Sequence, residues 1–247
     1  VGPQKTGPTA TVLLTAVVVL FCLIALGIPV GSNFIMSFSD SFSIEKFQFT
    51  LANYQNVLQP DGALLEGVKH SLSLAAVAAV IGLLIGFSVA YILTYSQFRL
   101  KRMIDMLTLV AMAVPGVVLG IGYIFVWNQK WLQPLGLNLY GKPEILILAS
   151  VASAVPLINR VLVGGMSKVP QELLTASQVE GARLGRRLRT ILLPLLHSSM
   201  VSAVLSAFGG SVFNLAITTI LYPPNYSTLP VYISDSYNDL NFGYAAA

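Results

Sequence analysis

The chain has 247 residues, of which 55% are hydrophobic and only 10% are charged, and its formal net charge is +4. An ordinary soluble domain carries about 25% charged residues, so these charges are too few to cover the surface of a soluble fold. A basic balance can indicate nucleic-acid binding, but the sequence has no basic stripe interleaved with aromatic residues. The composition therefore predicts a protein of the lipid bilayer.

The two ends of the sequence differ from its interior. Residues 1–8, "VGPQKTGP", are polar and rich in proline and glycine, which is unlike the start of a signal peptide. We interpret them as a tail or as the linker from an upstream segment. The last residues, "NFGYAAA", resemble the beginning of another apolar segment, so we expect that a sixth span is cut off at the C-terminus.

Five stretches are long and apolar enough to cross a membrane, which takes about 20 residues of helix. They cover roughly residues 9–30, 71–95, 104–127, 145–166 and 198–222. None shows the alternating polarity of a barrel strand, and helices satisfy their own backbone hydrogen bonds in lipid. The fold class predicted for residues 9–247 is therefore an all-α polytopic membrane domain. A short amphipathic helix is expected before Pro60 and Gly62, in "FTLANYQNVL".

The distribution of charge predicts the orientation. With a cytoplasmic N-terminus, most basic residues fall on the cytoplasmic side, whereas the outer segments hold most of the acidic ones. The inner basic residues are Lys5, Arg99, Lys101, Arg102, Arg160, Lys168, Arg183, Arg186, Arg187 and Arg189. The outer charged residues are Lys46, Lys69, Lys130, Lys142, Asp40, Glu45, Asp61, Glu66, Glu144, Asp235 and Asp239.

The segment between the fourth and fifth spans, residues 168–196, gathers an unusual share of the charge. Pro170 suits the first turn of a helix, and "QELLTASQ" after it is amphipathic. Gly181 permits a sharp turn, and Pro194 opens the next span. A short helix between two turns is a rigid projection that fits a groove on another protein. A basic loop that only orients the chain on the inner leaflet is the alternative.

The spacing in this segment resembles the EAA loop of the membrane permeases of binding-protein-dependent ABC importers, whose pattern is E-A-A-x3-G-x9-I-x-L-P. Five residues match that pattern: Ala176, Gly181, Ile191, Leu193 and Pro194. Thr175 stands where the family has glutamate, and Ser177 replaces the second alanine. Glu172 and Glu180 are the nearby candidates to take over any ionic contact of that glutamate.

The resemblance extends from about Tyr54 to the end, through "FRLKRMIDMLTLVAMAVPGVVLGIGYIF" and "LYPPNYSTLPVYI". It is strongest with the branch that imports ferric iron, whose relatives carry thiamine, 2-aminoethylphosphonate, polyamines or sulfate. The resemblance implies a bacterial inner-membrane protein in which loop 170–194 couples to a cytoplasmic ATPase dimer. It also implies an extracytoplasmic solute-binding protein and a second permease unit, either an identical copy or a fused half.

The chain is not expected to be an enzyme. It lacks the G-x-x-x-x-G-K-[ST] phosphate loop, so ATP and Mg²⁺ are expected on the partner subunit and no cofactor on this chain. No catalytic constellation converges at one depth, which argues against a membrane-embedded enzyme. Cys22 is alone, and His70 and His197 lie at opposite faces, so no metal site is predicted.

Two spans contain candidates for the solute pathway or its gate. In the third span they are Pro115, Gly116 and Gly120, where a kink is expected, and in the fifth they are Ser211 and Asn214. The alternative is close packing of small residues in the third span and hydrogen bonding between helices in the fifth. Asp105 and Arg160 fall near the cytoplasmic ends of their spans, so no ionisable residue lies deep in the membrane. This disfavours the more distant alternative, an ion-coupled secondary transporter.

Overall fold

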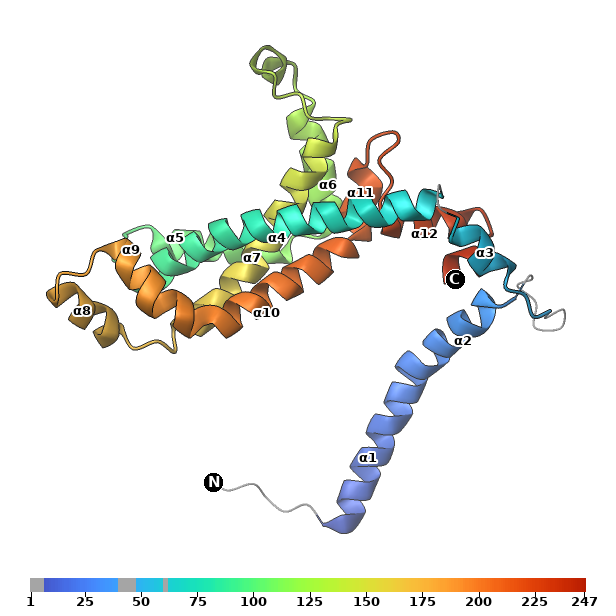
Figure 1. Ribbon diagram of the computed structural model, residues 1–247, viewed down its shortest axis with the longest axis horizontal. Coiled ribbons are helices and arrows are strands. Elements are labelled where there is room, and N and C mark those ends of the chain that lie inside the picture. The colour runs from blue at the N-terminus through green and yellow to red at the C-terminus, as the bar shows by residue number, and fades with distance from the viewer. Residues whose placement is uncertain (1–6, 40–47, 60–61) are drawn as a thin grey trace. The chain divides into compact units, whose positions relative to one another are not determined.

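The computed structural model describes residues 7–39, 48–59 and 62–247. Over these ranges the chain is helical, and its β-pairing is an isolated bridge between Ser39 and Phe49. The all-α class predicted from the sequence is therefore confirmed (Figure 1). Lys5, Asp40, Glu45, Lys46, Pro60, Asp61 and the first six residues of the expected tail lie outside the described residues.

The chain divides into two compact units. The first unit comprises residues 1–62 and 233–247, and the second is Ala63–Tyr232. Among the residues that the structure describes, four helices are long and apolar enough to cross a membrane, and a bent helix pair raises this number to five. The four are Pro8–Ser37, Ala63–Tyr95, Pro143–Met166 and Leu184–Val212, and the bent pair is Lys101–Ala113 with Gly116–Trp127.

In the first unit, α1 (Pro8–Cys22), a π-helical segment (Leu23–Gly27) and α2 (Ile28–Ser37) follow one another as a single apolar helix. No side chain of α1 is buried, so its apolar surface suits contact with lipid. The expected amphipathic helix is present as α3 (Ala52–Val57). The amide of Asn53 on α3 donates to the carbonyls of Ser37 and Ser39 at 3.1 and 2.8 Å. The C-terminal helix α13 (Phe242–Ala246) also contacts α3.

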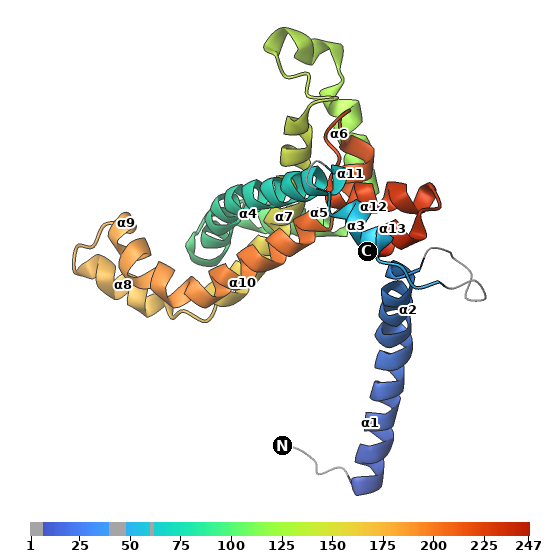
Figure 2. The same ribbon diagram turned by 45° about the vertical axis from the view of Figure 1, so that its right-hand side comes forward.

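Three long helices form the core of the second unit: α4 (Ala63–Tyr95), α7 (Pro143–Met166) and α10 (Leu193–Val212). They lie side by side in both views (Figures 1 and 2). Small residues let their backbones approach closely. At Gly86 on α4, an added Cβ would lie only 2.7 Å from Ile158 Cγ2 on α7. Ile158 is itself fully buried.

The third span is broken where the sequence predicted a kink. Its halves α5 (Lys101–Ala113) and α6 (Gly116–Trp127) meet at 108°. Val114 and Pro115 between them are extended. Proline has no amide hydrogen and disfavours helical geometry in the preceding residue, which explains the position of the break.

The fifth span is also divided. It consists of α10 and α11 (Leu215–Leu221), and Phe213 and Asn214 separate the two helices without a proline. On the other side, helix starts at Leu184, ten residues before the Pro194 that the sequence interpretation took as its beginning. Helix α9 (Leu184–Arg187) and a π-helical segment (Leu188–Leu192) lead into α10. The wider π-helical turn accommodates Pro194, whose ring blocks an ordinary helical hydrogen bond.

Shorter elements complete the chain. A 3₁₀ helix (Lys130–Leu135) follows α6, and α8 (Gln171–Val179) lies between α7 and α9. Helix α12 (Leu229–Asn238) follows the proline-containing segment after α11.

Candidate functional site

The first candidate site is the segment from α8 to the start of α10. The structure places Glu172, Thr175, Ala176 and Ser177 on α8 and Gly181 in the turn that follows. Ile191 lies in the π-helical segment, and Leu193 and Pro194 begin α10. In Figures 1 and 2, α8 and α9 lie at the end of the second unit opposite α11.

Gly181 closes α8 with a defined cap. Its φ is +82°, a conformation that only glycine adopts without strain. The amide of Gly181 donates to the Gln178 carbonyl at 3.0 Å, and that of Ala182 donates to Ser177 at 2.9 Å. These two bonds form a Schellman motif, which satisfies the last carbonyls of the helix while the chain reverses.

Most of the surface of α8 is open. Leu174 is buried against the rest of the chain, whereas Leu173 and Val179 are exposed, Val179 by 88%. The arrangement therefore presents a short helix with apolar contacts for a partner.

The polar residues of α8 divide into two kinds. The Thr175 hydroxyl donates to the Glu172 carbonyl at 3.0 Å, and the Ser177 hydroxyl donates to Leu174 at 2.8 Å. Both hydroxyls are thus satisfied within their own helix and do not replace a carboxylate. Glu172 and Glu180 are exposed and form no ion pair within the described residues, so their charges remain available for a partner.

One side-chain bond joins α8 to α9. Arg187 Nη1 donates to Gln178 Oε1 at 3.2 Å. This bond links the last turn of α8 to the helix beyond the Gly181 turn. It therefore restrains the angle between the projecting helix and the helix that leads into α10.

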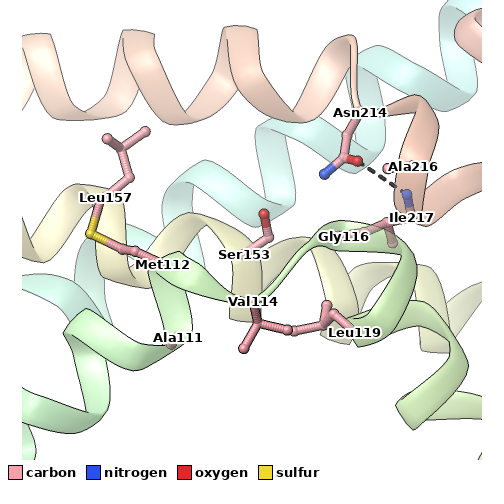
Figure 3. Close-up of a pocket in the computed structure, with 10 residues that line it drawn as sticks. All are labelled: Ala111, Met112, Val114, Gly116, Leu119, Ser153, Leu157, Asn214, Ala216 and Ile217. Carbon is pink, nitrogen blue, oxygen red and sulfur yellow. Dashed lines mark hydrogen bonds between the residues drawn. The ribbon is translucent and has the colours of Figure 1, made fainter.

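The second candidate site is a cavity of about 280 Å³ where the two broken spans meet (Figure 3). It is lined by Ala111, Met112, Val114, Gly116, Leu119, Ser153, Leu157, Asn214, Ala216 and Ile217. Of the pathway candidates, the structure brings Gly116 and Asn214 together here, whereas Pro115, Gly120 and Ser211 are not among the lining residues.

Asn214 organises the break before α11. Its Oδ1 accepts the Ile217 amide at 3.2 Å, which caps the helix, and its carbonyl accepts the Thr218 hydroxyl at 2.6 Å. Figure 3 shows this side chain at one wall of the cavity, with the Ser153 hydroxyl at another. The remaining lining side chains are apolar and none is ionisable. The cavity can offer hydrogen bonds to a solute but no charge.

Glycines allow α6 to approach α11 beside the cavity. An added Cβ at Gly116 would lie 3.0 Å from the Ala216 Cβ, and one at Gly120 would lie 3.1 Å from Ile220 Cγ2. Gly120 therefore packs helices and Gly116 both packs and lines the cavity. Ser211, near the end of α10, is buried.

Sequence reasoning missed Ser153 and the meeting of the two breaks. Ser153 stands within the apolar run "ASVASAVP", and a hydroxyl inside a span was a signal that could have found it. For metals, the described residues contain no cluster of three or more His, Cys, Asp or Glu side chains. His70 instead stacks on Tyr226, with ring centroids 3.9 Å apart.

Together, the apolar spans, the broken helices around a cavity and the projecting α8 define a helical membrane protein of the transporter class. Residues 81–247 match the family model described as "Binding-protein-dependent transport system inner membrane component". The match covers well over half of the chain, so the protein belongs to this family. It is a multi-pass protein of the inner membrane and a transport component, not an enzyme.

The names of individual relatives refer to different transported solutes. The chain is 27% identical over 221 residues to the ferric transport system permease protein FbpB of Actinobacillus pleuropneumoniae, covering 88% of this chain and 31% of the relative. It is 30% identical over 187 residues to the putative 2-aminoethylphosphonate transport system permease protein PhnV of Salmonella paratyphi A, covering 75% and 67%. The chain thus spans about a third of the length of its ferric relatives.

Solved structures show the same fold. A bacterial ABC transporter involved in the import of the acidic polysaccharide alginate matches with a TM-score of 0.73 at 15% identity, covering 99% of this chain and 92% of that one. The MetNI methionine ABC transporter in an inward-facing conformation matches with a TM-score of 0.53 at 20% identity, covering 73% and 82%.

Proposed function

We propose that this chain lines half of the solute pathway of an ATP-driven importer, and that loop 170–194 receives the movement of a cytoplasmic ATPase. The observation that carries this proposal is α8, a short helix held out by the Gly181 cap with Val179 almost fully exposed. Glu172, Thr175, Ala176, Ser177 and Gly181 form the docking part. Ile191, Leu193 and Pro194 form the connection to α10.

The helical backbone joins this loop to the cavity. From Leu184 to Val212 it continues without a break, and Asn214, which lines the cavity, follows two residues later. The chain changes direction between α9 and α10, where the π-helical segment and Pro194 fall (Figure 1). A displacement of α8 is therefore passed along one continuous helix to the break at Phe213 and Asn214.

The pathway is proposed to run past the cavity between the two breaks. Irregular backbone at membrane depth is tolerated where it lines a cavity or is buried in protein. Gly116 and Asn214 contact the passing solute in this proposal, Pro115 sets the break, and Gly120 and Ser211 hold the surrounding helices. Alternation between outward-open and inward-open states changes the distance between the two breaks.

Three kinds of partner are proposed on the basis of the family. The bacterial alginate ABC transporter, which shares this fold, has been solved in complex with an alginate pentasaccharide-bound periplasmic protein, which supports an extracytoplasmic solute-binding protein as a partner. We propose a second permease unit, an identical copy or a fused half, and an ATPase dimer that binds ATP and Mg²⁺. The N-terminus is proposed to be cytoplasmic, because this orientation puts the arginines of residues 183–189 inside.

Ferric iron is the proposed cargo, on the strength of the FbpB relatives. The PhnV relatives favour 2-aminoethylphosphonate as the second candidate, and thiamine, polyamine and sulfate are the remaining alternatives. An uptake assay with the cognate binding protein in proteoliposomes decides between them. Accumulation of 2-aminoethylphosphonate without accumulation of ferric iron would contradict the first assignment.

Co-purification tests the coupling proposal. Gly181→Val forces a β-branched residue into positive φ, which is a strongly disfavoured conformation. We expect at least a tenfold loss of the ATPase that purifies with the chain, with unchanged membrane insertion. Gly185→Val is the matched control, because an added Cβ there meets nothing within 4 Å. Uptake that persists in the absence of the ATPase would refute the importer proposal.

A further inference from the structure

A polar cluster joins α5 to α7. Arg160 Nη2 lies 2.8 Å from Asp105 Oδ1 and also donates to the Asp105 carbonyl at 3.2 Å and to Thr108 Oγ1 at 3.3 Å. Asn159 Nδ2 donates to the same Thr108 oxygen at 3.4 Å. The Thr108 hydroxyl in turn donates to the Asp105 carbonyl at 2.8 Å. The four side chains thus connect two spans through one network.

Elsewhere α5 is loosely held. None of its residues is buried, whereas 11 of the 24 residues of α7 are buried. An apolar groove of about 390 Å³ lies between α5, α7 and α4, with Ile104, Leu107 and Ala111 on the α5 side. Because apolar packing is incomplete here, the polar cluster is the specific connection between α5 and the core.

The cluster is not fully satisfied in this arrangement. Asn159 is completely buried, yet its Oδ1 has no hydrogen-bond partner, and neither has the buried Nε of Arg160. A buried polar atom without a partner is costly. Rotation of the Asn159 amide by 180° exchanges Oδ1 and Nδ2, and the Thr108 hydroxyl can then donate to Asn159 Oδ1 instead of the Asp105 carbonyl. The same side chains therefore offer a second set of bonds.

We propose that Asp105, Thr108, Asn159 and Arg160 form a latch that holds α5 in either of two positions against α7. This proposal rests on the proposed function, in which the cavity beside the breaks belongs to the pathway. Ala111 and Met112 line that cavity and lie one turn beyond Thr108 on α5. A shift of α5 therefore changes the cavity directly, and the four residues act as positioning residues that do not touch the solute.

Polar contacts suit this task better than apolar packing. A tightly packed apolar interface has one arrangement, since its side chains interlock. Hydrogen bonds and ion pairs can exchange partners without leaving a void. The Asp105 and Arg160 side chains are 41% and 28% exposed near the cytoplasmic ends of their spans, so they can exchange partners without being transferred into lipid.

The test uses the whole transporter, with its ATPase and binding protein, in proteoliposomes. Spin labels are placed at Met103 on α5 and at Ser167 after α7, both exposed, in a Cys22→Ser background. We expect two distances whose populations exchange when a non-hydrolysable ATP analogue binds. In Asp105→Asn and Arg160→Gln, one population is lost, uptake falls at least tenfold, and solute-independent ATP hydrolysis rises at least threefold.

Two controls separate a latch from a structural role. Lys101→Gln removes a charge from α5 outside the cluster, and should leave distances and uptake unchanged. The double variant Asp105→Arg/Arg160→Asp restores the pair, and should recover at least a third of the uptake. The proposal is overturned if the single variants keep both distances and normal uptake, or if they lose assembled complex in proportion to uptake and the double variant recovers nothing.

Failure of the proposed function would look different. In that case the unmodified complex would show no ATP-dependent uptake, whatever the labels on α5 report. If the complex imports solute but the two spin labels show a single distance that does not change with nucleotide, the latch proposal is overturned and the proposed function is not.

Discussion

The second unit contains two unbroken helices, α4 and α7, which pack tightly against each other. It also contains two broken helix pairs, α5/α6 and α10/α11, which separate around a cavity. Between α4 and α7 the backbones approach so closely that Gly86 has no room for a methyl group beside Ile158. At the two breaks the helices separate around a cavity of about 280 Å³. This difference indicates that α4 and α7 form a rigid scaffold, and that the broken helix pairs beside them are the parts able to move.

The chemistry of the two regions differs in the same way. The core of the scaffold consists mainly of alanine and aliphatic side chains, with Tyr91 and Tyr95 packed against it, whereas Pro115 and Asn214 mark the breaks. Backbone groups released at a break need other partners within the membrane, and side-chain caps such as Asn214 supply them. Changes in the scaffold should therefore affect stability, and changes at the breaks and the loop should affect transport.

The largest effect is expected from Gly86→Val, which lies at the α4–α7 interface of the scaffold. The added side chain must displace the buried Ile158, and overpacking of this kind costs about 1–3 kcal/mol. Thermal unfolding of the purified chain in detergent should move down by roughly 5 °C. Gly164→Val on α7 is the control, since an added Cβ there meets nothing within 4 Å. Equal melting temperatures for both variants would remove the claim that α4 and α7 form the rigid part.

A smaller effect is expected from Asn214→Ala at the second break. The substitution removes the cap on the Ile217 amide, which is worth about 0.5–2 kcal/mol. Because the cap shapes the cavity wall, we expect uptake to fall several-fold, with a smaller drop in melting temperature than Gly86→Val causes. Asn214→Ser keeps a hydroxyl cap and should retain most of the uptake. Wild-type uptake by the alanine variant would show that the break does not depend on this side chain.

The smallest effect is expected from Arg187→Ala in the loop. One hydrogen bond to Gln178 is lost, and because Gln178 is exposed, its contribution lies at the lower end of about 0.5–1.5 kcal/mol. Binding of the ATPase, measured by titration, should weaken about two- to fivefold, and Gln178→Ala should weaken it equally. Arg186→Ala removes the same charge without the bond. If Arg186→Ala weakens ATPase binding as much as Arg187→Ala does, the net charge of the loop controls this binding and the angle of α8 does not.

The sequence predicted the elements that depend on local signals. Long apolar runs predicted helical spans, Pro115 marked the bend in the third span, and the Gly181 spacing indicated the loop. The break at Phe213 and Asn214 was not predicted, because no proline marks it and an asparagine inside an apolar run fits a continuous helix as well. The start of helix at Leu184 was missed because Pro194 is normally a helix start, and the π-helical segment that accommodates it has no simple sequence signature.

Contacts between residues that are far apart in the sequence could not be predicted from the sequence. Asp105 and Arg160 were placed near the same membrane face, but their pairing depends on how α5 lies against α7. The cavity likewise depends on two breaks meeting in space, one of which was unknown. The packing role of Gly120 against Ile220 could be suspected from its size, yet only the fold identifies its partner.

The most direct test of the account is a cross-link from α8 to the ATPase. A cysteine at Val179, the most exposed apolar residue of that helix, is introduced into a Cys22→Ser chain within the complete transporter. We expect a disulfide or short cross-link to a cysteine on the ATPase surface, with a yield that changes when ATP binds, and none from a cysteine at the buried Leu174. A Val179 cysteine that reacts with water-soluble reagents at the same rate with and without the ATPase, and forms no cross-link, would contradict it.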